Sequence, residues 1–435
     1  MTFEKLLQQS LLWRGFYFIT LLLVNIVLSR FLQADGSGWI YYLTNFFSLI
    51  LLLASLSIES GYTYYASGNI INHNKLAWFS LLWTLVMAII VGCIIAYYFG
   101  VVKNDSPAQV NNYLLYSITY ICGIMLINFF TVLFYAHKNF WLPNLLLGLL
   151  NVVLVVLILV INNFSNTYFT VVNSYFLFIL LQGIVLAIAF IIMNNSFAVF
   201  LLPNKAELKL LFKYSLVALA GNVLFFFMYK IDYWFVRYYC NSHDLGNYIQ
   251  ASKLAQMVLI IPQILASVIF PQSASGIQKQ DVGTSILILF RILLQVFLLL
   301  IILTFFIGST FFTTVFGQSF SNVQIPFLLL LPGIFSMSIT VLLAAYFSGH
   351  GFIKFNVLGT GLGLIVVVLL DIILVKKMGI VGASIASSVG YTSFLLYALW
   401  HFKKLHQFSI QQMLAFATDD WRWVKNILLH KSPAS

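Results

Sequence analysis

The sequence alternates between long apolar runs and short polar breaks along its whole length. Each run holds about 20 residues or more, which at 1.5 Å per residue lets an α-helix cross a hydrocarbon core of roughly 30 Å. The runs lack the short alternating pattern of barrel strands, so an all-α integral membrane protein is predicted. We expect 12 transmembrane helices, near residues 10–32, 39–66, 76–102, 113–135, 141–162, 168–193, 211–238, 246–271, 284–312, 322–347, 355–376 and 381–402.

The first run, from Ser10 to Leu32, is interpreted as a retained transmembrane helix. It is too long for the apolar core of a signal peptide, has no small-residue cleavage site and contains Arg14. The N-terminal segment is therefore expected to stay in the membrane.

Composition agrees with a membrane location. Only 8% of the 435 residues are charged and 62% are hydrophobic, with a mean hydropathy of +0.99. Soluble domains carry about a quarter charged residues. A soluble class of protein is therefore excluded.

The distribution of basic residues predicts the orientation in the membrane. With the N-terminus inside, the inner loops and tails carry Lys5, Lys75, Lys138, Lys205, Lys209, Lys279, Lys354, Lys403, Lys404, Arg422, Lys425 and Lys431. The outer connections carry only Arg30, Lys103, Arg237, Lys376 and Lys377. This positive-inside bias predicts that both termini are cytoplasmic, and it accounts for most of the net charge of +11 without a nucleic-acid partner.

The longest inner connection, Asn194–Leu210, falls between the sixth and seventh predicted spans. A division there gives an N-terminal six-helix lobe at residues 1–200 and a C-terminal six-helix lobe at residues 201–402. Residues 403–435 would form a cytoplasmic tail, either as a helix at the membrane interface or as a solvated segment.

The two predicted lobes carry similar sequence stretches. "RFLQADGSGWIYY" follows the first span and "RYYCNSHDLGNYI" follows the seventh, with Arg30 and Arg237 about 207 residues apart. "FYAHKNFWLPN" before the fifth span and "YFSGHGFIKFN" before the eleventh are offset by about 212 residues. An even number of spans separates the copies, so the lobes would be related by a pseudo-two-fold axis along the membrane normal, with the substrate between them.

The same stretches resemble a known family. "LSRFLQADGSGWIYYLTNFFSLILLLASLSIESG" is similar to the opening of polysaccharide flippases. "DYWFVRYY" together with "DLGNYIQASKLAQMVLIIPQILASVIFPQSA" is similar to their seventh and eighth helices, including Gly246 and Tyr248. "LLDIILVKKMGIVGASIASSVGY" resembles their junction between the last two helices, with Gly379 and Gly382 in the turn. Asp371 departs from the pattern, because relatives often carry a neutral Asn there.

The resemblance implies a Wzx-type O-antigen flippase of the MOP (MATE-like) exporter superfamily. Such flippases are twelve-helix alternating-access carriers of the bacterial inner membrane. They move undecaprenyl-diphosphate-linked oligosaccharide repeat units of O-antigen (lipopolysaccharide), capsule or exopolysaccharide from the cytoplasmic to the outer leaflet. The implied partners are this lipid-linked oligosaccharide, membrane lipids, and the polysaccharide polymerase and chain-length machinery. A MATE-type cation or drug antiporter and a lipid II flippase remain alternatives.

Charged residues inside the predicted spans are the candidate functional residues. Each costs about 2.5–3.5 kcal/mol at mid-bilayer, so each calls for a partner or a wet cavity. A carrier of a diphosphate needs cations to offset the phosphate charge. The candidate substrate-binding residues are Arg14, Lys230, Lys253 and Arg291.

The acidic residues Glu59, Asp232 and Asp371 have two possible roles. They could carry an exchanged H⁺ or Na⁺, or they could neutralise the lysines in salt bridges between helices. Glu59 lies at a depth similar to that of Arg14, so these two form a candidate pair. No other cofactor is expected.

No enzyme motif appears in the sequence. It contains no Walker motif, HExxH, CxxC or nucleophile elbow, and no predicted loop is long enough to hold a catalytic site. "GTGLG", with Gly359, Gly361 and Gly363, lies within an apolar span and predicts close helix packing, or a bend during gating, rather than a nucleotide loop. A transporter rather than an enzyme is expected.

Overall fold

The computed structural model describes residues 3–66, 68, 70–103, 106–161, 167–194, 200–274, 279–406 and 420, and this part of the chain contains no strand. It divides into two compact units, Met1–Val223 and Leu224–Ser435. The boundary falls inside one long helix, α7 (Lys205–Tyr239). The all-α fold expected from the hydropathy pattern is confirmed.

In its described residues, the first unit has six α-helices, a short π-helix and the first part of α7. These elements are α1 (Phe3–Ser55), α2 (Ile58–Tyr65), α3 (His73–Tyr97), η1 (Tyr98–Val102), α4 (Pro107–Ala136), α5 (Trp141–Ile161) and α6 (Thr167–Met193).

The part of the second unit that the structure describes contains the rest of α7, six further α-helices and a short 3₁₀ turn. They are α8 (Ser242–Met257), α9 (Ile260–Ala274), α10 (Lys279–Phe316), η3 (Gln318–Phe320), α11 (Gln324–Gly349), α12 (Ile353–Met378) and α13 (Ile380–His406).

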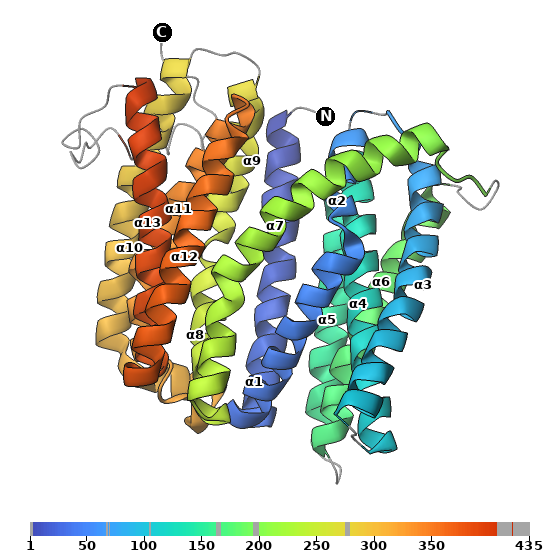
Figure 1. Cartoon of the computed structure of the whole chain (residues 1–435), viewed down its shortest axis with the longest axis horizontal. Helices are drawn as coiled ribbons and strands as arrows, with labels where there is room; N and C mark the ends of the chain where they lie inside the picture. The colour runs from blue at the N-terminus through green and yellow to red at the C-terminus, as the bar shows by residue number, and fades with distance from the viewer. Residues whose placement is uncertain are drawn as a thin grey trace. The chain divides into compact units, whose positions relative to one another are not determined.

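Two of the 12 predicted spans lie in one helical element. α1 has 53 residues, and its helical conformation is broken at Gln33, where φ is 54° and ψ is −172°. Its two halves run in opposite directions, as Figure 1 shows. The described chain therefore has 11 helices long and apolar enough to span a membrane, with the first of them containing two predicted spans. The protein is a multi-pass membrane protein.

The second predicted span of each half is interrupted. In the first unit, α1 ends at Ser55 and α2 begins at Ile58, with left-handed φ values of 51° and 54° at Leu56 and Ser57. In the second unit, Val258 and Leu259 separate α8 from α9. An interruption therefore occurs in the second predicted span of both halves of the chain, a feature that the sequence analysis did not predict.

Polar residues in the connections before α3, α4 and α8 cap these helices. Asn72 accepts a hydrogen bond from the Asn74 backbone N–H at 2.8 Å, and Asn241 accepts from the Asp244 N–H at 2.7 Å. Ser106 and Gln109 form a capping box at the start of α4. These side chains satisfy N–H groups that have no partner inside the helix.

Glycine allows α12 and α13 to approach closely. A Cβ atom on Gly390 would lie 2.9 Å from the Gly363 carbonyl oxygen and 2.3 Å from Val367 Cγ2. Gly359 faces Phe394, whereas Gly361 has nothing within 4 Å. The close packing predicted for "GTGLG" is confirmed at Gly359 and Gly363 and wrong at Gly361.

Candidate functional site

A polar cluster lies inside the second unit, where α7, α8 and α13 contribute side chains. Asp232 of α7 is only 1% exposed. Its Oδ2 accepts hydrogen bonds from the Tyr248 hydroxyl of α8 and from Ser387 Oγ of α13, the latter at 3.0 Å. Its Oδ1 accepts from the Tyr233 backbone N–H at 2.9 Å. Neutral donors thus surround a carboxylate that the membrane interior would otherwise disfavour.

Lys230 of α7 is half-buried beside this carboxylate but is held by neutral groups. Its Nζ donates to the Tyr233 hydroxyl at 3.1 Å and to Gln256 Oε1 at 3.2 Å. The ammonium also lies 4.7 Å from the centre of the Tyr233 ring. Among the described residues Lys230 forms no ion pair, and its charge acts on Asp232 only over a longer distance.

The neutral groups around Lys230 form a connected network. The Tyr233 hydroxyl donates to Ser252 Oγ at 2.9 Å, and Gln256 Nε2 donates to the same oxygen at 3.0 Å. Lys253 directly follows Ser252 on α8 and is half-buried. It lies near enough to Lys230 for the two side chains to interact as like charges. The structure therefore brings the two predicted lysines into one region.

Asp371 of α12 adds a second carboxyl group to this region. It is 0% exposed, and neither of its carboxylate oxygens has a hydrogen-bond partner among the described residues. It lies near enough to Asp232 for the two carboxyl groups to interact. Two lysines and two aspartates therefore share one part of the second unit, while Asp371 forms none of the predicted salt bridges to a lysine among the described residues.

Arg291 of α10 is neutralised by the C-terminal tail. Its guanidinium donates to both carboxylate oxygens of Asp420, from Nε at 2.7 Å and from Nη2 at 2.5 Å. The predicted interfacial helix of the tail otherwise lies outside the described residues. Arg291 was predicted only as a cation for substrate, and the sequence carries no pattern that pairs it with the tail.

Arg14 of α1 lies against aromatic rings rather than against Glu59. Its Nε donates to the Tyr135 hydroxyl at 3.3 Å, and its guanidinium lies 4.6 Å from the Tyr135 ring centre and 5.9 Å from that of Phe140. Glu59 has one carboxylate oxygen buried without a hydrogen-bond partner. The predicted pair between Arg14 and Glu59 is therefore wrong. The long Arg side chain reaches the end of α4 and stacks there instead.

The neutral partners in the cluster are the residues that sequence reasoning missed. Tyr248, Ser252 and Gln256 are spaced four residues apart, which places them on one face of α8. This spacing is the feature of the sequence that could have identified them. No such feature distinguishes Ser387, because serine is frequent along α13. The described residues contain no group of three or more metal-ligating side chains.

The fold is shared with a class of solved membrane transporters. No protein-family model matches the sequence, and no curated protein matches it. Solved structures do match over almost the whole chain, and they include transporters of the MOP superfamily. The chain has the fold of these MOP transporters.

Three of these structures illustrate the match. The lipid II flippase MurJ, in an inward closed conformation, superposes with a TM-score of 0.69 at 14% identity, over 98% of this chain and 94% of MurJ. The Vibrio cholerae MATE transporter VcmN in its bent form gives a TM-score of 0.64 at 14% identity, over 92% of this chain and 96% of VcmN. A MOP superfamily transporter from Pyrococcus furiosus gives 0.63 at 14% identity, over 92% and 94% of the two chains.

Proposed function

We propose that the protein is a flippase for an undecaprenyl-diphosphate-linked oligosaccharide. It would move the repeat unit of an O-antigen, capsule or exopolysaccharide from the cytoplasmic to the outer leaflet of a bacterial inner membrane. Both termini would be cytoplasmic, and transport would proceed by alternating access. The fold supports a transporter, and one structure with this fold is named as a flippase of another lipid, lipid II.

The observation that carries this proposal is the environment of Lys230. An ammonium group within an apolar span costs about 2.5–3.5 kcal/mol at mid-bilayer. Lys230 is nevertheless held by the Tyr233 hydroxyl and the Gln256 amide oxygen, with no ion pair in the described part of the chain. Its positive charge therefore stays available for an anionic ligand.

Lys253 adds to the same positive field. An anion that lies between or beside these two half-buried lysines would stabilise both of them as ammonium groups. A diphosphate carries this kind of charge, and Lys230 and Lys253 could each donate hydrogen bonds to its oxygens. Arg14 and Arg291 enter the proposal less directly, because aromatic rings and Asp420 already contact them.

Asp232 and Asp371 support a role in ion coupling. A buried carboxyl group without hydrogen-bond donors, beside a second carboxyl group, is a suitable place for an H⁺ or Na⁺ to bind and leave. We propose that this pair carries the coupling ion while the lysines contact the phosphates.

The same acidic pair favours the alternative, a MATE-type cation or drug antiporter. An antiporter of this type would place a cationic substrate or ion at Asp371 and would not need Lys230. A lipid II flippase would share the diphosphate chemistry and differ only in the sugar. Lys230 therefore separates the two alternatives, because a lipid II flippase would need its positive charge and an antiporter would not.

The test uses a strain that lacks the gene. The undecaprenyl-linked oligosaccharide is expected to accumulate in the cytoplasmic leaflet, surface polysaccharide should be lost, and the intact gene should restore both. Normal surface polysaccharide together with increased sensitivity to cationic drugs would establish the antiporter instead. Accumulation of lipid II in the inner leaflet would identify the second alternative.

A further inference from the structure

A separate polar cavity lies in the first unit, at ends of α3, α4, α6 and α7. It has a volume of about 760 Å³, within the usual range for small-ligand sites. Two isoleucines form part of its wall, and the other side chains are mostly polar. The polar lining includes His73, Asn74, His137, Lys138, Asn194 and Glu207.

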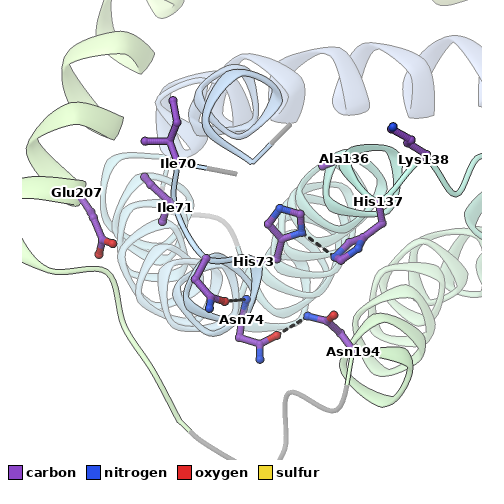
Figure 2. A pocket seen from close by; sticks show the side chains of 10 residues that line it. Ile70, Ile71, His73, Asn74, Ala136, His137, Lys138, Asn194 and Glu207 are labelled. Carbon is purple, nitrogen blue, oxygen red and sulfur yellow. Dashed lines mark hydrogen bonds between the residues drawn. The ribbon is translucent and has the colours of Figure 1, made fainter. Parts of the chain in front are cut away.

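Two histidines meet at this cavity. His73 Nδ1 and His137 Nε2 are 2.6 Å apart, and the two rings are nearly perpendicular, with an interplanar angle of 85°. Figure 2 shows the rings pointing toward each other from the start of α3 and the end of α4. The residues are separated by 64 positions in the sequence, so tertiary packing brings them together.

The contacts of His73 fix which nitrogen carries hydrogen. His73 Nε2 lies 2.9 Å from the Ala66 carbonyl oxygen. A carbonyl oxygen only accepts hydrogen bonds, so Nε2 must donate, and neutral His73 presents the lone pair of Nδ1 to His137. Metal-binding histidines are commonly oriented in this way, with the second ring nitrogen bonded to a backbone carbonyl.

His137 offers the second nitrogen, from the end of α4. Its Nε2 faces His73 Nδ1, and its side chain is exposed and lines the cavity. Lys138 is exposed beside it, and Lys75 is tied to Glu207 by bonds of 2.9 and 3.0 Å. The position of His137 therefore suits it to the same role as His73.

We propose that His73 Nδ1 and His137 Nε2 bind one divalent transition-metal ion of the Zn²⁺, Ni²⁺ or Cu²⁺ class. Imidazole nitrogen is a preferred ligand of these ions. On binding, neutral His137 moves its proton from Nε2 to Nδ1, so both facing nitrogens offer a lone pair and no net proton is released. Tetrahedral bonds of 2.0–2.1 Å would widen the nitrogen separation to about 3.3 Å.

The metal would join two helix ends. Water from the cavity completes its coordination, since the described residues supply no third histidine, cysteine or carboxylate ligand. The ion would replace one hydrogen bond between the start of α3 and the end of α4 by two coordinate bonds. This site is independent of the proposed transport substrate.

Titration calorimetry on the full chain in detergent, without a histidine tag, tests the proposal. NiCl₂ or ZnCl₂ at pH 7.5 should show one site, and H73Q and H137Q should each weaken binding ten-fold or more. H350Q is a matched control. His350 also has a ring nitrogen, Nδ1, that lies close to a backbone carbonyl oxygen, at 3.0 Å from that of Tyr346, but it belongs to the other unit. Two results would overturn the proposal. In the first, wild type and H137Q bind the metal equally well; in the second, the metal that wild type binds is lost in H350Q.

A second measurement uses the wild-type chain alone, so it does not depend on whether the variants fold. One equivalent of Cu²⁺ should give an electron paramagnetic resonance spectrum with splitting from two imidazole nitrogens. A spectrum without nitrogen splitting would show that the histidines do not bind the metal. Circular dichroism of H73Q and H137Q separates lost binding from lost structure.

Discussion

The guanidinium of Arg291 and the carboxylate of Asp420 form a two-bond ion pair in which both side chains are largely buried, with exposures of 14% and 3%. Removal of one partner leaves the other charge buried without compensation, which costs about 3–5 kcal/mol in soluble proteins. D420N and R291Q are therefore each expected to lower the unfolding temperature in detergent, followed by tryptophan fluorescence. The unfolding temperature of the double variant should fall by less than the sum of the decreases in the two single variants. Additive losses would mean that the pair does not contribute as a unit.

Charge reversal at Lys230 tests the proposed anion site. K230E should abolish flipping of the lipid-linked oligosaccharide while membrane abundance stays normal, because a carboxylate in that position repels the diphosphate. K377E, at the exposed end of α12, is the matched control and should keep near wild-type activity. K253E is expected to behave like K230E. Full transport by both K230E and K253E would leave the lysines with a structural role only.

The two buried aspartates are expected to differ in their contribution to stability. D371N removes no hydrogen bond within the described part of the chain, where neither Asp371 oxygen has a partner, and should leave the unfolding temperature unchanged or higher. D232N can place an amide N–H₂ against the hydroxyl donors of Tyr248 and Ser387 and should lower it. In proteoliposomes, D371N should also uncouple transport from an imposed proton or sodium gradient. Gradient-driven transport that persists in D371N would remove Asp371 from the coupling site.

Close contact between α12 and α13 predicts opposite outcomes at two glycines. G390A forces a Cβ against the Gly363 carbonyl oxygen and Val367, so a marked drop in thermal stability and in the yield of folded protein is expected. G361A meets nothing within 4 Å and replaces a poor helix former, so it should be neutral or stabilising by up to about 1 kcal/mol. Comparable stability of the two variants would contradict the packing described for Gly390.

The histidine pair predicts a specific pH dependence of stability. The pKa of His137 is lowered in the folded protein, so the unfolded chain binds more protons just below pH 6.5. The contribution of His137 to the free energy of unfolding should therefore be complete above about pH 7 and fall as the pH drops through 6.5 toward the folded pKa. His73, Lys138 and Glu207 also line the cavity, and Glu207 is paired with Lys75, so the comparison must be made against H137Q. The difference in unfolding temperature between wild type and H137Q should shrink between pH 7.5 and 5.5, in metal-free buffer.

Much of the fold follows from hydropathy alone. A long apolar run has few options in a bilayer besides a helix, so the spans were predictable without any knowledge of contacts. The cost of charge in the membrane also pointed to Lys230, Asp232, Lys253 and Asp371, and the structure places these residues in one region of the second unit. Their functional role remains a proposal.

The partners of those charges were not predictable in the same way. Arg291 and Asp420 are 129 residues apart, and no spacing rule connects a transmembrane helix to a tail. Arg14 had a carboxylate at similar depth in Glu59, yet aromatic contacts with Tyr135 and Phe140 are what the packing provides. Hydroxyl groups such as that of Ser387 are too common for the sequence to single out the one that bonds Asp232.

The reversal of α1 at Gln33 also fixes a rotational register. Its first and second halves are joined with a single non-helical residue, so no loop absorbs a change in length. One residue inserted after Gln33 would turn the following helix by about 100° about its axis and move it by about 1.5 Å. Every side chain from the turn to Ser55 would then face a different neighbour. The backbone conformation at Gln33 therefore determines which side of the second predicted span faces the protein and which side faces lipid.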